Sequence, residues 1–162
     1  MKLASKRAAV ATVGVAACGV IAAAALASPP SGFTPTTLVP EAEIAESVHV
    51  NSDRVKFQTK GPADVRDQRV DIAPGGSSGS HHHPGIVIVA VETGTVTYVA
   101  SNCDKTAYGA GSPNGSVFVE SGDDPHEVRN LTAQPATVYG TFVAPDADPG
   151  VFRIEDPPIN CP

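Results

Sequence analysis

Residues 72–99 of the chain, IAPGGSSGSHHHPGIVIVAVETGTVTYV, contain the pattern that decides the fold. Three adjacent histidines stand between a Gly/Ser-rich loop and a long apolar run, which then turns back at a Glu-Thr-Gly sequence. Because side chains alternate between the two faces of an extended segment, His81 and His83 share one face and His82 points to the other. Two imidazoles on one face are half of a metal site. The only later histidine, His126, is the candidate for the other half.

Short strand patterns recur on both sides of this stretch, each ended by Gly, Pro or Asp clusters. The 15 Gly and 15 Pro residues fit frequent turns and leave little room for long helices. Residues 40–46 are compatible with a short helix, and residues 101–114 read as a polar loop. The sequence therefore predicts an all-β sandwich or small barrel. The strands are expected at 48–50, 55–58, 69–72, 85–91, 95–100, 116–120, 126–131, 136–143 and 151–154.

The first 27 residues have the features of a secretory signal peptide. Lys2, Lys6 and Arg7 precede an uncharged, alanine-rich run that ends in Ala-Leu-Ala. The alternatives are an uncleaved membrane anchor through residues 8–27 and lipidation at Cys18. We expect a secreted or extracytoplasmic protein, with residues 28–45, rich in Pro, Ser and Thr, as a flexible tether. Residues 46–162 then form the folded domain.

The charge balance and the cysteines limit the partners and the compartment. After residue 27, 8 basic and 17 acidic groups remain, a net charge of −9. Nucleic acid and anionic lipid both require a basic face, so neither is expected as a partner, and no membrane contact is expected beyond the N-terminal segment. The same part of the chain keeps two cysteines, Cys103 and Cys161. An exported chain favours a disulfide between them, with two free thiols as the alternative.

The apolar run at residues 86–91 does not alternate with polar residues. A strand that is apolar on both faces needs cover on both sides, and the barrel core can supply only one. The other cover would be residues 44–60 or a second subunit. A homodimer is therefore a hypothesis of the sequence.

Residues 74–85, the apolar strand and Gly94 resemble the first motif of the cupin superfamily, in which a glycine precedes a His-x-His pair and another closes the hairpin. Residues 115–130 resemble the second motif, with a leading glycine, a turn, His126 and Asn130. The resemblance covers roughly residues 65–145. It implies a cupin-type β-barrel, a jelly-roll-like double sheet, and often a dimer.

The resemblance also implies a metal held by His81, His83 and His126. The family's usual carboxylate ligand maps onto Val87, so here an apolar side chain would face the metal. Gln68, Glu120 and Asn130 are candidates for hydrogen bonds to a ligating imidazole. Catalytic residues are not assigned.

Imidazole ligands suit a divalent transition metal, and the pattern does not choose among Fe, Mn, Zn, Ni and Cu. Two functional classes follow. The first is an exported binding module that holds a metal and a small-molecule ligand in the barrel. The second is a metalloenzyme of dioxygenase, isomerase or hydrolase type that acts on a small chelating substrate. A degenerate, metal-free barrel is the third alternative.

Overall fold

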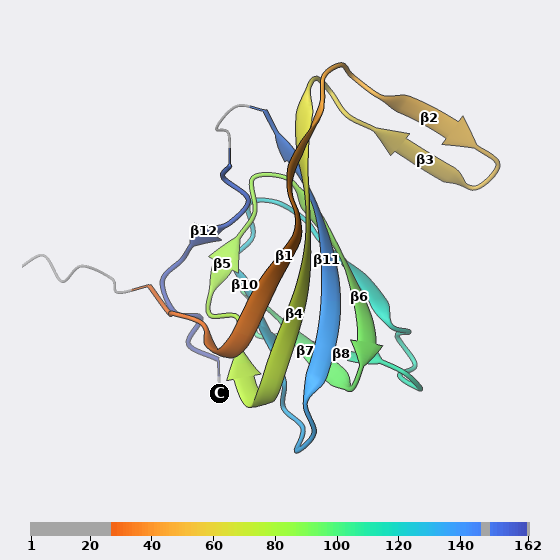
Figure 1. Cartoon of the computed structure of the whole chain (residues 1–162). Helices are drawn as coiled ribbons and strands as arrows, with labels where there is room; N and C mark the ends of the chain where they lie inside the picture. Colours follow the sequence, from red (N-terminus) through yellow and green to blue (C-terminus); the bar gives the residue numbers. More distant parts are fainter. Residues whose placement is uncertain (1–26, 147–149, 162) are drawn as a thin grey trace, which may run out of the picture.

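The computed structural model describes residues 27–146 and 150–161 as an all-β molecule (Figure 1). Every regular element in these ranges is a strand, which confirms the predicted fold class. The strands are β1 (Ser31–Ile44), β2 (His49–Ser52), β3 (Val55–Gln58), β4 (Ala63–Ser77), β5 (His81–His82), β6 (Ile86–Thr93), β7 (Thr95–Ala100), β8 (Lys105–Gly109), β9 (Val117–Glu120), β10 (His126–Arg129), β11 (Ala136–Pro145) and β12 (Ile154–Glu155).

Ten of these strands form one bent antiparallel sheet that curls into a nearly closed barrel. Its main path runs β12-β5-β10-β4-β11-β6-β9, with β1 beside β4 and β7 joining β10 to β8. Neighbours in the sheet are often far apart in the sequence, as in the pairing of β4 with β11 and of β5 with β10. This curvature places the inner faces of β5, β6, β9 and β10 around one hollow.

The core follows from the period-2 alternation of the strands. In β6, Val87, Val89 and Val91 are buried, whereas Ile86 and Ile88 are exposed. The inward side chains pack with those of β4, β7 and β11 in one apolar cluster. Each buried valine stabilises the fold by about 1.5–3 kcal/mol relative to an exposed one. The hairpin from β6 to β7 turns at Gly94, whose φ of 73° and close approach to the Pro135 carbonyl exclude a Cβ.

The expected tether at residues 28–45 is wrong for most of its length. Residues 31–44 form β1, which pairs with β4 from Ser31↔Ser77 to Ile44↔Ala63. The same strand replaces the short helix considered for residues 40–46. Proline cannot donate to a β ladder, and Pro35 and Pro40 are tolerated because β1 is an edge strand that pairs on one side only. The composition of an edge strand can therefore resemble that of a linker.

The expected polar loop at residues 101–114 contains one further strand. Lys105–Gly109 form β8, which pairs with β7 from Thr95↔Gly109 to Val99↔Lys105. Its side chains alternate between exposed and half-buried positions. A strand of this kind depends on its neighbour rather than on a strong pattern of its own.

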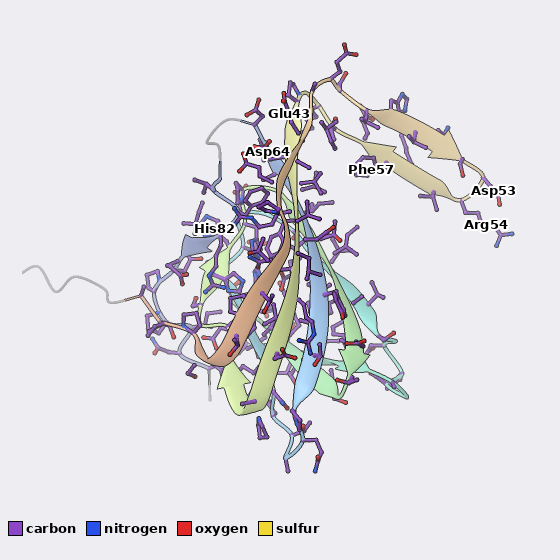
Figure 2. All side chains as sticks on the ribbon, viewed as in Figure 1. Glu43, Asp53, Arg54, Phe57, Asp64 and His82 are labelled. Carbon is purple, nitrogen blue, oxygen red and sulfur yellow. A yellow bond between two sulfur atoms is a disulfide. The ribbon has the colours of Figure 1, made fainter. Side chains whose placement is uncertain are left out.

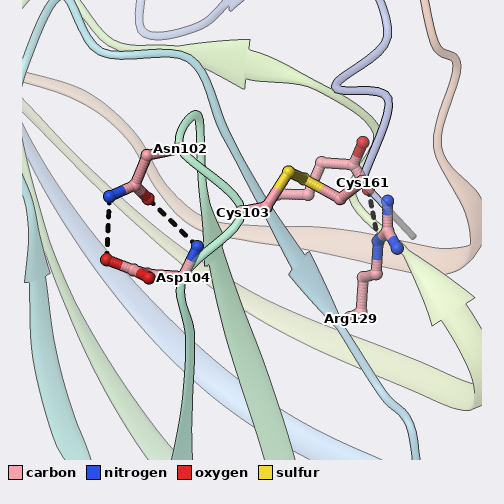
Figure 3. The surroundings of a disulfide bond; sticks show 6 residues. Asn102, Cys103, Asp104, Arg129 and Cys161 are labelled. Carbon is pink, nitrogen blue, oxygen red and sulfur yellow. Dashed lines mark hydrogen bonds and ion pairs between the residues drawn. A yellow bond between two sulfur atoms is a disulfide. The ribbon is translucent and has the colours of Figure 1, made fainter.

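The predicted disulfide between Cys103 and Cys161 is present. Figure 3 shows that it joins the loop after β7 to the C-terminal segment, close to Arg129 of β10. Arg129 Nε donates to Glu127 Oε2 at 2.6 Å. The bond thereby anchors the end of the chain against the barrel wall.

The hairpin of β2 and β3 projects away from the barrel (Figures 1 and 2). Asp53 and Arg54 lie at its tip, and Val50 and Val55 are 48% and 65% exposed. The two strands pair only with each other.

The predicted export segment lies almost wholly outside the described residues, since residues 1–26 are not among them. Among the residues that are described, no helix has the length and apolar character needed to cross a membrane.

Candidate metal centre

The barrel brings together three histidines and one glutamate in its interior. His81, His83, Glu120 and His126 each offer one ligand atom, and these atoms all lie within 4.8 Å of one another. All four side chains are buried, and none is more than 3% exposed. Four polar, titratable groups at this depth need mutual partners or a bound ion.

Strand pairing explains how the histidines meet. His81 in β5 lies opposite His126 in β10, and His126 also lies opposite Ala100 in β7. The alternation predicted for the histidine run is confirmed, because His81 and His83 are buried while His82 is half-buried on the other side. His82 Nδ1 lies 2.7 Å from Asp156 Oδ2, near β12 (Figure 2). Its imidazole therefore contributes to the surface and not to the centre.

The backbone holds each of the three rings by its Nδ1 atom. The acceptor is the carbonyl of Gly79 for His81, of Phe152 for His83 and of Asp124 for His126, at 2.9, 2.6 and 2.8 Å. A carbonyl can only accept, so Nδ1 carries the proton in each ring. In the neutral imidazole, Nε2 then carries a lone pair that can bind a metal.

Glu120 faces two of these lone pairs. Its carboxylate oxygens lie 3.1 Å from His83 Nε2 and 3.5 Å from His126 Nε2. Neither Nε2 has a hydrogen-bond partner of good geometry, although both atoms are fully buried. The carboxylate oxygens and the unprotonated Nε2 atoms are all hydrogen-bond acceptors, so they repel one another unless a cation lies between them. The arrangement therefore fits a metal ion, or a proton in its place.

The pKa values describe the centre without an ion. Burial lowers the pKa of His81 to about 3, helped by the charge of Arg153, so this ring stays neutral. Burial would raise the pKa of Glu120, but the adjacent His126 and His83 rings lower it to about 2. Burial likewise opposes the charged form of His126, yet the adjacent Glu120 carboxylate raises its pKa. The carboxylate is thus charged, and His126 is the ring that takes a proton most readily.

Glu120 replaces the missing carboxylate of the first motif. Val87 is buried and faces the interior, as its position in the strand predicts. Directly opposite it in the sheet, β9 places Glu120, in the register Val87↔Glu120. A carboxylate therefore occupies the position paired with Val87 on the neighbouring strand of the sheet.

The other two residues considered for hydrogen bonds to the ligands do not make them. Asn130 caps the turn after β10, where its Nδ2 donates to the carbonyls of Ile72 and Gln134. Gln68 lies in the barrel wall, and its Nε2 donates to Thr37 Oγ1 at 3.4 Å. The sequence predicts Glu120 only as a hydrogen-bond partner of a ligating imidazole, because its position beside the histidines depends on strand pairing. The alternation of β9, which buries Phe118 and Glu120 together, was the one available signal.

A cavity of about 250 Å³ opens beside the candidate metal centre. Its walls are mainly apolar and come from β1, β4, β6, β10, β11 and the C-terminal segment. Two arginines, Arg66 and Arg153, also line it. The cavity adjoins three of the four candidate ligands: His81, His83 and Glu120.

Together these features define a small antiparallel barrel protein with a candidate metal centre in its interior. The family model described as a cupin domain matches residues 68–143, from β4 to β11, and this stretch contains all four candidate ligands. By this match, residues 68–143 of the chain are a cupin domain.

Several solved structures resemble the chain at low sequence identity. A cupin domain from Bordetella pertussis Tohama I is 15% identical, with 74% of this chain and 99% of that chain covered and a TM-score of 0.45. A cupin-2 domain protein from Rhodospirillum rubrum is 15% identical, with 76% and 70% covered and a TM-score of 0.48. The Cupin_2 domain of an XRE family transcriptional regulator from Enterobacter cloacae is 17% identical, with 71% and 98% covered and a TM-score of 0.48. Among curated proteins the sequence finds no match.

Proposed function

We propose that this chain is an exported cupin that binds a divalent transition metal and a small-molecule ligand in its barrel. His81, His83 and His126 are the predicted metal ligands, and Glu120 joins them. The proposal depends on one observation above all: four buried ligand atoms converge within 4.8 Å. The Nδ1 atoms are already satisfied by backbone carbonyls, so the rings are oriented before any ion arrives.

Three imidazoles and one carboxylate suit Fe, Mn, Zn, Ni or Cu, and the donor set does not choose among them. When bound, such an ion would act as a Lewis acid or as a redox centre toward a ligand in the cavity. The chain's own contribution is to hold the donors, to neutralise one positive charge through Glu120 and to shield the site with apolar walls.

Export is proposed from the basic start, the apolar run and the small-residue exit of residues 1–27. The Cys103–Cys161 disulfide supports an oxidising compartment, where such bonds persist. Cleavage, retention as an anchor and lipidation at Cys18 predict three different masses for the mature chain, and mass spectrometry of the exported protein separates them.

The metal proposal is tested by metal analysis of protein purified without a histidine tag from cells that express the full chain. The wild type is expected to hold about one metal ion per chain. His81→Ala should lose most of the metal, whereas the matched variant His82→Ala should keep it, because His82 pairs with Asp156 outside the centre. Equal loss of metal in both variants would contradict the proposal. So would a wild type that holds no metal after incubation with each candidate ion, and the protein would then be a degenerate, metal-free barrel.

A metalloenzyme is the second candidate, and Glu120 is the observation that favours it. Its carboxylate provides an acidic group beside the three histidines, although the usual carboxylate position of the first motif is taken by Val87, and the adjoining cavity is large enough for a small substrate. Oxygen uptake by iron-loaded protein with small diketones, thiols and catechols screens for this activity. Flat traces would favour the binding module.

A further inference from the structure

Arg66 lies on the same level of the barrel as the metal-ligating carboxylate. Strand pairing links Arg66↔Phe142, Phe142↔Val87 and Val87↔Glu120 across four adjacent strands: β4, β11, β6 and β9. All four side chains line the cavity. One row of the sheet therefore carries a guanidinium at one end, two apolar side chains in the middle and a metal-ligating carboxylate at the other end.

The guanidinium of Arg66 is held in place but keeps its charge unmatched. Its Nε donates to the carbonyl of Pro40 at 2.8 Å, and its Cζ lies 4.1 Å from the centre of the Phe152 ring. Stacking on an aromatic face orients a guanidinium and leaves the hydrogen-bonding edge available. In residues 27–146 and 150–161, no carboxylate forms an ion pair with Arg66, and this includes Asp64, two positions before it in β4.

Arg153, the other arginine of the cavity, is already engaged. Its Nε donates to Glu155 Oε1 at 2.6 Å, and its terminal nitrogen donates to Glu155 Oε2 and to the carbonyl of Ser78. Its charge is matched by that of Glu155. Arg66 is thus the cavity cation left for a ligand.

We infer that the ligand is a small carboxylate with an apolar body. Its carboxylate pairs with Arg66, its body lies across Phe142 and Val87, and its far end faces the metal. This inference rests on the proposed metal function, since the metal defines that far end. Guanidinium and carboxylate match as a bidentate pair, which is stronger than a neutral hydrogen bond and selects this anion by shape. A cavity of about 250 Å³ limits the ligand to a small molecule.

The inference is tested with two probes of the same shape, 3-phenylpropionate and its uncharged amide, by calorimetry on zinc-loaded protein. The wild type should bind the carboxylate at least about tenfold more tightly than the amide. Arg66→Gln should abolish this preference while the metal content stays unchanged. Arg66→Lys, which keeps the charge but loses the fork, should retain part of it.

Arg69→Gln is the matched control. It removes an arginine from the same strand, but Arg69 pairs with Asp71 and is 40% exposed, so the preference should persist. Thermal unfolding of each variant identifies one that fails to fold. Equal binding of the two probes by the wild type, binding of neither, or an unchanged preference in folded Arg66→Gln would overturn the inference. Metal analysis of the wild type is a separate measurement. If the wild type holds no zinc, the metal proposal is overturned and not this inference.

Discussion

At the scale of single residues, Glu120 supplies the negative charge of the candidate metal centre. Glu120→Gln keeps the size of the side chain but removes the charge that faces His83 and His126. Metal affinity should fall by at least about 100-fold, the upper end for residues that only support a ligand. A competition titration against a chromophoric chelator measures the change.

Glu127→Gln is the control for this substitution, because Glu127 is equally buried but pairs with Arg129 outside the centre. Its metal affinity should match that of the wild type. Unchanged affinity in Glu120→Gln would mean that the carboxylate is not a ligand.

The raised pKa of His126 predicts that protons and metal compete at this residue. Because Glu120 raises this pKa above the ordinary 6.5, protonated His126 stabilises the metal-free fold fully below pH 6.5. That contribution is lost as the pH rises through the raised folded value. A ligating imidazole must be deprotonated, so metal binding at pH 6 should release about one proton. The metal should also bind more weakly at pH 6 than at high pH.

Calorimetry in two buffers of different protonation enthalpy counts the released protons. The number should fall toward zero as the pH is raised above the folded pKa of His126. An equal number of protons at pH 6 and pH 9 would contradict the assignment.

At the scale of elements, the C-terminal segment is joined to the site by backbone contacts and to the barrel by the disulfide. The Phe152 carbonyl orients His83, and Asp156 pairs with His82. The disulfide joins residues 58 positions apart in the sequence. Removing it with Cys103→Ser and Cys161→Ser together should lower the free energy of unfolding by about 2–4 kcal/mol.

Urea unfolding of the double variant and of the oxidised wild type measures this difference. Wild type in reductant should behave like the double variant. Identical midpoints for the oxidised wild type and the variant would show that the segment is held by its other contacts alone.

At the scale of the whole molecule, the outer face of β6 and β9 remains uncovered among the described residues. Ile88 and Val119 face each other across this pair and are 40% and 58% exposed, and Val117 is 53% exposed. The β2–β3 hairpin projects away from the barrel and does not cover these residues (Figure 1). An apolar patch of this kind marks an interaction surface, and the homodimer expected from the sequence stays a prediction.

Light scattering should give the mass of two chains for the wild type and of one for Ile88→Glu. Leu131→Glu, which charges an exposed apolar position in the turn after β10, should leave the dimer intact. A monomeric wild type would remove the prediction.

Local sequence patterns were enough for much of this molecule. The alternation around the histidine run separated His81 and His83 from His82, and the glycine of the hairpin placed the turn at residue 94. Two cysteines after a predicted export segment indicated one bond. The all-β class followed from short strands between turn residues. Each of these features depends on residues that are neighbours in the chain, or on a composition that leaves few choices.

Strand pairing over long distances decided the rest. Residues 31–44 became an edge strand because β4 offered them a partner, although their composition resembles a linker. Glu120 entered the centre because β9 lies beside β6 in a register that sets it opposite Val87. Phe152 reached His83 from 69 positions away. No local pattern encodes such a register, since it is selected only when the sheet closes and all its inward side chains must share one interior.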